Sequence, residues 1–203
     1  MALSDPQAPS PPPSGGLGSV PERLLAAGQL LWRIHGSADG PVFFGKNKRY
    51  RFDDPRSEYG VLYAGLDAYC AFLETYGRVP DSQGIVLRSS LKSGSISSLL
   101  IKKPLKLVDL TGHHLAQLRI DSKIFSYTDY SATQQWSRAL FDHSSSFHGL
   151  LFHSRHDPTR LAVALFDRGG PASLAIRQTQ GLLGPSFASD LAAILDLYQF
   201  ALV

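Results

Sequence analysis

The chain has 203 residues and 43% of them are hydrophobic, which is enough to bury one core of ordinary size. Its net charge of +3 and scattered basic residues argue against direct nucleic-acid binding, although a mild positive field suits an anionic small molecule. The single cysteine excludes a disulfide framework and a thiolate metal site, and without a long apolar run or signal peptide we expect a cytoplasmic protein with no membrane partner.

Residues 1–20 are rich in proline, serine and glycine and contain few residues that could build a core. This composition predicts a disordered or semi-extended tail, although its PSPPP segment could instead dock on an aromatic groove as a polyproline helix. Residues 21–203 are predicted to form one domain, which begins with a short helix at residues 21–25.

Residues 29–35 (QLLWRIH) alternate well enough to predict a strand, and this strand contains Arg33. An arginine in a buried strand ordinarily pairs with an acid. The alternative is that Arg33 faces a pocket and binds phosphate oxygens through two N–H groups. A loop then leads to Arg51, which precedes the turn at residues 53–55, where one of the two aspartates could pair with it.

Residues 50–78 are the most informative stretch of the chain. A predicted strand at 60–64 is followed by a helical pattern from Leu66 to Gly77 that is apolar on every face, which predicts a mostly buried helix with the cysteine in the core. Glu74 is the only charged residue between Asp67 and Arg78. A carboxylate in such surroundings must be paired, neutralised or used in a site, and the simplest alternative is a bridge to Arg78.

The rest of the chain contains more predicted strands than helices, and the two do not alternate strictly. This order predicts an α+β domain, with a mixed or antiparallel sheet and flanking helices. The predicted strands lie at 85–87, 97–102, 105–110, 149–153, 161–166 and 173–178, and the predicted helices at 113–118, 129–140 and 190–200.

Two serines of this half are candidates for a site. Ser131 lies near the start of a predicted helix, with Gln134 three residues on, and a hydroxyl there either helps to bind an anion or only caps the helix. Ser154 follows a core strand and opens the sequence SRHD. Four adjacent residues cannot all converge on one substrate, so we interpret SRHD as a polar turn in which Ser154 alone could face a cleft. The histidines have no recognised metal spacing, so no metal site is predicted.

No Walker loop, GxGxxG, GxSxG, HExxH or CxxC motif occurs in the chain. Their absence argues against P-loop ATPases, Rossmann oxidoreductases, the usual serine hydrolases and zinc proteases. An enzyme that binds NAD in a cleft of an unrelated fold remains compatible with the sequence.

Six short segments occur in a characteristic order. They are WRIHG at 32–36, RFDDP at 51–55, LYAG at 62–65, FLET at 72–75, and the later YSATQQW and HSR. In this order they resemble the RES-domain family, the toxins of bacterial toxin–antitoxin pairs. The resemblance implies an ADP-ribosyltransferase-like fold that uses NAD as its substrate, needs no separate cofactor, and cleaves the nicotinamide–ribose bond by phosphorolysis or hydrolysis. It also implies an antitoxin with a helix-turn-helix domain as a partner, and often a toxin homodimer.

The functional positions of the family carry over one by one. Its two arginines fall on Arg33 and Arg51, its tyrosine on Tyr63 and its glutamate on Glu74. Some members have a second aromatic residue directly after the first arginine. This chain has Ile34 there, which puts a stacking role at that position in doubt.

Each of these residue types suits the cleavage of an N-glycosidic bond. Positive charge builds on the ribose as the bond breaks, and the Glu74 carboxylate would stabilise it. Tyr63 offers a flat surface to nicotinamide, and the two arginines can neutralise the pyrophosphate. The family serine has two candidates. We therefore predict catalytic roles for Glu74, Arg51 and Ser131, NAD binding by Arg33, Tyr63, Arg51 and Ser131, and secondary roles for Ser154 and Gln134.

Two alternatives come from other functional classes. The same pocket could transfer ADP-ribose to a protein instead of to water or phosphate. Alternatively, Glu74 and the arginines could form a structural ion-pair network in a binding module that is not an enzyme.

Overall fold

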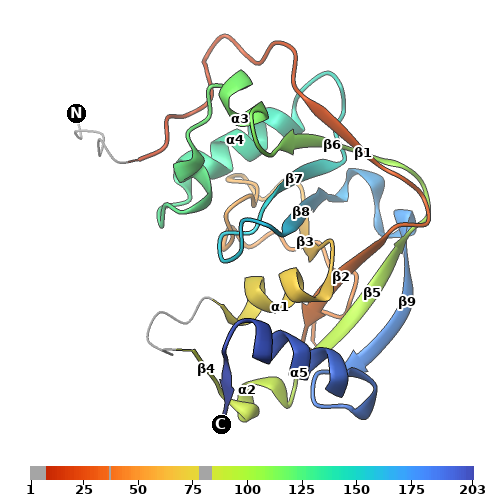
Figure 1. Cartoon of the computed structure of the whole chain (residues 1–203). Coiled ribbons are helices and arrows are strands. Elements are labelled where there is room, and N and C mark those ends of the chain that lie inside the picture. Colours follow the sequence, from red (N-terminus) through yellow and green to blue (C-terminus); the bar gives the residue numbers. More distant parts are fainter. Residues whose placement is uncertain (1–7, 37, 78–83) are drawn as a thin grey trace.

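An eight-stranded sheet is the centre of the molecule (Figure 1). The computed structural model describes residues 8–36, 38–77 and 84–203. The strand order is β1-β6-β7-β8-β3-β2-β5-β9, and every pair of neighbours is antiparallel except β6 and β7. The strands are β1 (Glu22–Leu25), β2 (Leu30–His35), β3 (Val61–Gly65), β5 (Ser95–Ile101), β6 (Leu105–Leu110), β7 (Gly149–His153), β8 (Leu161–Phe166) and β9 (Leu174–Gly181).

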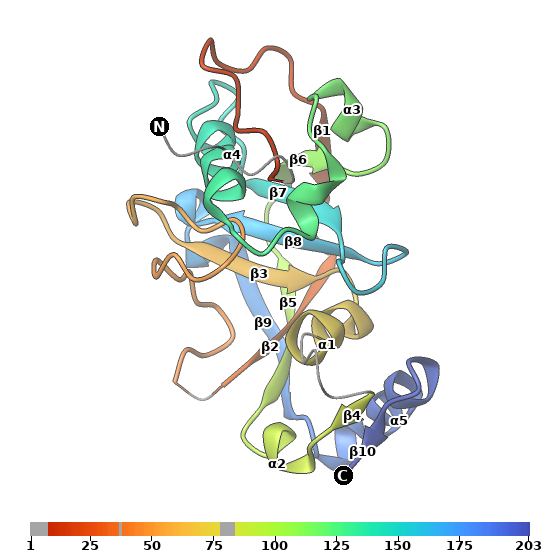
Figure 2. The ribbon, with the colours of Figure 1, turned by 90° about the vertical axis from the view of Figure 1, so that its left-hand side faces the viewer.

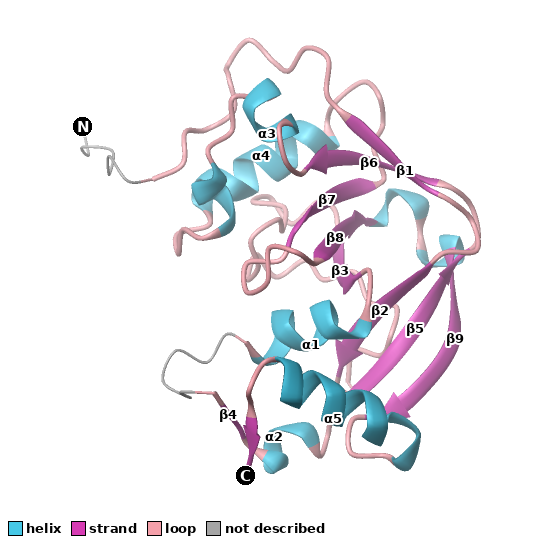
Figure 3. Ribbon diagram, viewed as in Figure 1, coloured by secondary structure: helices cyan, strands magenta, loops and turns pink. Residues whose placement is uncertain are grey.

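The helices form two groups, one at each end of the sheet (Figure 3). Helices α3 (His114–Gln117) and α4 (Ser131–Phe141) lie beside β6 and β7, and α1 (Ala68–Tyr76) and α5 (Ala188–Leu197) lie beside β2 and β5. The second group also includes the short α2 (Arg88–Leu91) and the parallel pair β4 (Ile85–Val86) and β10 (Ala201–Leu202). The predicted α+β domain with a mixed sheet is confirmed. Within the described ranges, every helix is too short or too polar to cross a membrane.

The sheet bends sharply between β3 and β2, which are joined through the single register pair Trp32–Gly65. Figure 2 shows β7, β8 and β3 crossing the middle of the molecule, with α4 on one side of them and α1 on the other. Strands β7 and β8 are buried on both faces, which explains their nearly continuous apolar runs. Successive β8 residues, such as Val163 and Ala164, point into different hydrophobic clusters.

The helix predicted at 21–25 is wrong. These residues form β1, which pairs antiparallel with β6 from Glu22 opposite Val108 to Leu25 opposite Leu105. A single helical turn is costly to nucleate, whereas a short strand on an existing edge gains backbone hydrogen bonds at once. The tertiary partner therefore decides the local structure.

The described part of the N-terminal segment, residues 8–20, contains no helix or strand, but it is not a free tail. The indole of Trp136 donates to the carbonyl of Ser10 at 2.8 Å, and the ring of His143 lies 3.1 Å from the carbonyl of Gly18. Val20 is buried in the cluster beneath α4. Residues 8–20 thus pack against the domain without forming a helix or strand.

Helix α1 is mostly buried, as predicted. Its N-cap is Asp67, whose carboxylate accepts from the Cys70 backbone N–H at 2.8 Å. Cys70 is fully buried, and burial raises the pKa of its thiol, so it is a core residue. The helix lies close to the end of β3 because Gly65 has no side chain there. A Cβ atom at Gly65 would lie 2.7 Å from the Ala71 nitrogen.

Gly65→Ala is therefore expected to lower the free energy of unfolding by about 1–3 kcal/mol, because backbone atoms of α1 would have to move away from the added methyl group. Urea unfolding measures the change. Gly36→Ala is the matched control, since a Cβ atom at Gly36 meets nothing within 4 Å. Equal stability of the two variants would show that α1 does not depend on this close approach.

Candidate functional site

A hollow opens where α1, the end of β7 and the loop before β3 come together. Its volume is about 290 Å³, including the part that is open to solvent. Arg51 and Glu74, two of the residues predicted to be catalytic, both line it. The other lining residues are Phe125, Phe152, His153, Arg155 and His156.

Glu74 is the acid of this hollow, and two groups of the turn after β7 donate to it. The hydroxyl of Ser154 donates to Glu74 Oε1 at 2.7 Å, and the backbone N–H of Arg155 donates to the same oxygen at 3.3 Å. Glu74 is half-buried, whereas Ser154 is only 2% exposed. The apolar helix thus presents its one carboxylate to donors across the hollow. Arg78, the alternative partner considered from the sequence, lies outside the described residues.

The two candidate serines differ in position. Ser154 contacts Glu74 directly, whereas Ser131 is exposed at the first position of α4, where its backbone N–H donates to the Asp129 carboxylate at 2.8 Å. Gln134 is buried and donates to the carbonyls of Lys48 and Tyr50, each at 3.0 Å. The geometry therefore favours Ser154 as the serine of the site and makes Gln134 a tether for the loop that leads to Arg51.

Arg51 is held by several contacts of the segment that precedes α4. It is 8% exposed, and one of its terminal nitrogens donates to the carbonyls of Ile124 at 2.7 Å and Tyr127 at 3.1 Å. Its guanidinium also lies 4.7 Å from the centre of the Tyr130 ring. These contacts hold the guanidinium at the wall of the hollow, where its N–H groups suit an anionic ligand.

Tyr63 and Arg33 form a second group on the neighbouring strands. The Tyr63 hydroxyl donates to Asp53 at 3.0 Å and accepts from the backbone N–H of Phe52 at 2.8 Å, and its ring meets Tyr50 edge-on at 5.6 Å. Arg33 donates to the Tyr63 carbonyl at 2.9 Å. Burial lowers the pKa of Arg33, although the group remains charged. Tyr63 thereby connects Arg33 to the backbone beside Arg51.

Arg33 also has an unused donor. Its Nε atom is buried without a hydrogen-bond partner among the described residues. Because a buried donor is costly to leave unsatisfied, this atom is a candidate contact for a phosphate or carboxylate ligand. Arg33 and Tyr63 do not line the hollow itself. They lie on the neighbouring strands β2 and β3, so a ligand that contacts them would have to extend beyond the hollow.

Three residues at the end of β7 and in the turn after it were not predicted as site residues. His153, Arg155 and His156 line the hollow with Arg51 and Glu74, so Arg155 adds a second cation and the imidazoles add further polar nitrogens. One feature of the sequence could have indicated these residues: the polar segment SRHD directly follows a predicted core strand. In the described part of the chain, no three histidine, cysteine, aspartate or glutamate side chains are arranged to hold a metal ion.

Comparisons with known proteins agree with the resemblance seen in the sequence. The model of the family described as RES domain matches residues 30–189. A protein of Sinorhizobium fredii (strain NBRC 101917 / NGR234), named "Probable toxin y4kH", is 31% identical over 115 residues, which cover 57% of this chain and 87% of that protein. A chain from the crystal structure of the M. tuberculosis MbcT–MbcA toxin–antitoxin complex superposes with a TM-score of 0.64 at 16% identity, over 84% of this chain and 92% of the other.

The Tyr63–Asp53 hydrogen bond gives a pH-dependent prediction. Burial raises the pKa of Asp53, so its contribution to stability increases as the pH falls through that pKa. Tyr63→Phe removes a donor to the charged carboxylate and is expected to cost about 1–3 kcal/mol of unfolding free energy at pH 7. The cost shrinks toward pH 4, where Asp53 becomes protonated.

Urea unfolding at pH 7 and pH 4 measures this difference. Tyr76→Phe is the control, because the Tyr76 hydroxyl makes only a long contact, 3.4 Å, with the Ser90 carbonyl. A Tyr63→Phe cost that is the same at both pH values would contradict the role given to Asp53.

Proposed function

The chain belongs to the RES domain family, and from this membership and the geometry of the hollow we propose that it is a toxin that degrades NAD. The reaction is cleavage of the nicotinamide–ribose bond. The observation that carries the proposal is the placement of Glu74: a hydroxyl donor holds its carboxylate in the same hollow as the buried guanidinium of Arg51.

The carboxylate supplies the electrostatic part of the reaction. As the bond from ribose C1′ to nicotinamide breaks, the sugar becomes oxocarbenium-like and the nicotinamide leaves as a neutral molecule, so no strong general acid is needed. Glu74 faces the developing charge, and the Ser154 hydroxyl fixes the orientation of the carboxylate before the reaction begins. Preorganisation of this kind acts in the transition state more than in the bound substrate.

The cations bind the rest of the dinucleotide. Arg51 and the unsatisfied donor of Arg33 can take pyrophosphate oxygens. From the family resemblance, we assign the Tyr63 ring to the nicotinamide. The acceptor at C1′ is water or phosphate. For phosphate, Arg155 provides a positive group, and His153 and His156 provide imidazole N–H donors. NAD is thus a substrate, and the chemistry proposed here uses no other cofactor.

An antitoxin is the partner that such an enzyme requires, because uncontrolled loss of NAD harms the cell that makes it. The M. tuberculosis neighbour is a toxin–antitoxin complex by its title, and its fold is shared by this chain. We extend the pairing to this protein, with an antitoxin segment covering the hollow around Glu74.

Glu74→Gln is expected to reduce nicotinamide release from NAD by about 10²–10³-fold, because the charge that meets the cationic sugar is lost while the shape is kept. Glu58→Gln is the matched control. Glu58 is an exposed acid that pairs with Arg138 and does not line the hollow, so its variant should turn over like the wild type. Full activity of a folded Glu74→Gln protein would refute the assignment.

Arg51→Ala tests the anion-binding half of the site. It is expected to abolish NAD consumption, with retained folding checked by circular dichroism, because the variant removes the buried cation of the hollow. Arg49→Ala is a suitable comparison, since Arg49 is exposed and its guanidinium lies 5.8 Å from the centre of the neighbouring Tyr50 ring, outside the hollow. Wild-type consumption by a folded Arg51→Ala protein would remove Arg51 from the site.

The two serines are separated by a direct comparison. Ser154→Ala is expected to lower turnover at least about tenfold more than Ser131→Ala, because only Ser154 donates to the Glu74 carboxylate. Nicotinamide release under saturating NAD measures the difference. The reverse order would return the role to Ser131 at the start of α4.

Transfer to a protein is distinguished from NAD degradation by the fate of the ADP-ribose. NAD labelled in the adenylate half is added to a cell lysate with the purified protein. Label in small molecules alone supports degradation, whereas label on a protein band would show that the same hollow serves an ADP-ribosyltransferase.

A further inference from the structure

The two residues of the acid–hydroxyl pair come from separate segments. Glu74 belongs to α1 and Ser154 to the turn between β7 and β8. The distance between the Ser154 hydroxyl and the Glu74 carboxylate therefore depends on how these two segments pack against each other. We propose that Arg160 is a positioning residue for this pair, and that with Asp67 and Asp157 it fixes the start of α1 against the turn and the end of α5. The inference rests on the proposed function of the pair.

The first connection runs to α1. A terminal nitrogen of Arg160 donates to one oxygen of the Asp67 carboxylate at 2.9 Å, while the other oxygen caps the helix by accepting from the Cys70 N–H at 2.8 Å. Arg160 therefore holds the residue that starts the helix. Glu74 lies seven residues further on, about 10 Å along the helix axis, so a small tilt at the cap displaces its carboxylate.

The second connection runs to Ser154 through the backbone. The N–H of Ser154 donates to the carbonyl of Arg160 at 2.9 Å, and the N–H of Arg160 donates to the carbonyl of Asp157 at 2.9 Å. The Asp157 carboxylate also accepts from the N–H and hydroxyl of Thr159, at 2.9 and 2.6 Å. Arg160 thus closes the turn on one side and holds α1 on the other.

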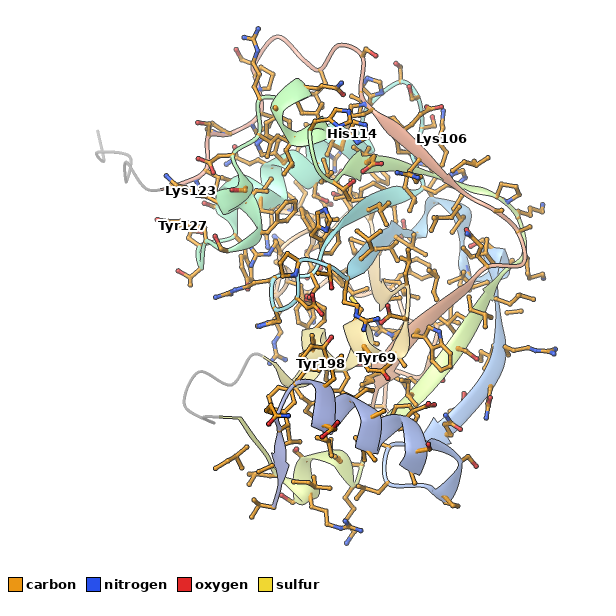
Figure 4. The ribbon with its side chains drawn as sticks, in the orientation of Figure 1. Tyr69, Lys106, His114, Lys123, Tyr127 and Tyr198 are labelled. Carbon is orange, nitrogen blue, oxygen red and sulfur yellow. The ribbon has the colours of Figure 1, made fainter. Side chains whose placement is uncertain are left out.

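The third connection includes α5. Tyr198, which directly follows α5, donates its hydroxyl to Asp157 at 2.7 Å, and Asp157 lies 3.6 Å from Nε of Arg160. The Arg160 guanidinium lies over the Tyr69 ring at 4.5 Å from its centre. Figure 4 shows Tyr69 and Tyr198 close together between α1 and α5, with their ring centres 6.4 Å apart. Burial and the bond to Asp157 raise the pKa of Tyr198 to about 12, so it keeps the donated proton.

The exposure of these side chains indicates whether Arg160 affects stability or turnover more strongly. The side chains of Arg160 and Asp67 are 28% and 37% exposed, and ion pairs so near solvent add little to global stability. Misplacing a catalytic group by about 1 Å, in contrast, costs on the order of 10²-fold in rate. Loss of Arg160 should therefore reduce turnover far more than it reduces folding.

The test compares Arg160→Gln with Arg168→Gln. Arg168 is a matched arginine, because it also makes one side-chain hydrogen bond and lies over one aromatic ring. Both of these contacts are with Phe141 of α4, and not with α1 or the 154–160 turn. In nicotinamide release, Arg160→Gln is expected to lower kcat about 10–100-fold with KM for NAD within about threefold of wild type. Arg168→Gln should keep both values and both proteins should melt within a few degrees of wild type.

Two further variants separate positioning from a merely structural role. Arg160→Lys keeps the charge facing Asp67 and should recover part of the lost kcat. In the Glu74→Gln background, Arg160→Gln should add little further loss, because Arg160 acts through Glu74. Wild-type kcat in Arg160→Gln, a change in KM alone, or a full additional loss in the Glu74→Gln background would each overturn the inference.

Failure of the proposed function gives a different result. If the wild-type protein releases no nicotinamide, the function is wrong, and the positioning role is then read from amide hydrogen exchange. Faster exchange of α1 and the 154–160 turn in Arg160→Gln than in Arg168→Gln would support the structural connection, and equal exchange would overturn it.

Discussion

The hydrogen bond from the Ser154 hydroxyl to the Glu74 carboxylate is the contact on which the candidate site depends. It joins residues 80 positions apart, one on a nearly all-apolar helix and one at the end of a strand buried on both faces. The buried strands make the Ser154 end rigid, and the cap at Asp67 sets the helix that carries the other end. A carboxylate held in this way needs little reorganisation when positive charge develops in front of it.

Arg51 is the buried cation that lines the same hollow as this acid. Two backbone carbonyls and an aromatic ring are among the groups that hold it. A guanidinium fixed in this way presents its N–H groups at set positions, which suits the recognition of a phosphate group.

Local patterns in the sequence were sufficient to predict much of the fold, including β2, β3, β6 to β8 and the buried α1. They failed at residues 21–25, where pairing with the edge of β6 decides the structure. Of the residues predicted to be catalytic, Glu74 and Arg51 line the hollow, whereas Ser131, which was ranked above Ser154, does not. The choice between the two serines depends on a long-range contact, which the residues around either serine do not encode. For the same reason, Arg155 and His156 of the turn after β7 were not predicted as site residues. Their place beside Glu74 comes from the packing of this turn against α1.

One experiment tests the central claim most directly: purified protein is incubated with NAD, with and without phosphate, and the products are identified by mass spectrometry. If Glu74 faces a cationic ribose, NAD disappears and nicotinamide appears in equal amount, together with ADP-ribose or its 1″-phosphate. Intact NAD in both reactions, from protein shown to be folded and free of any bound partner, would contradict the account.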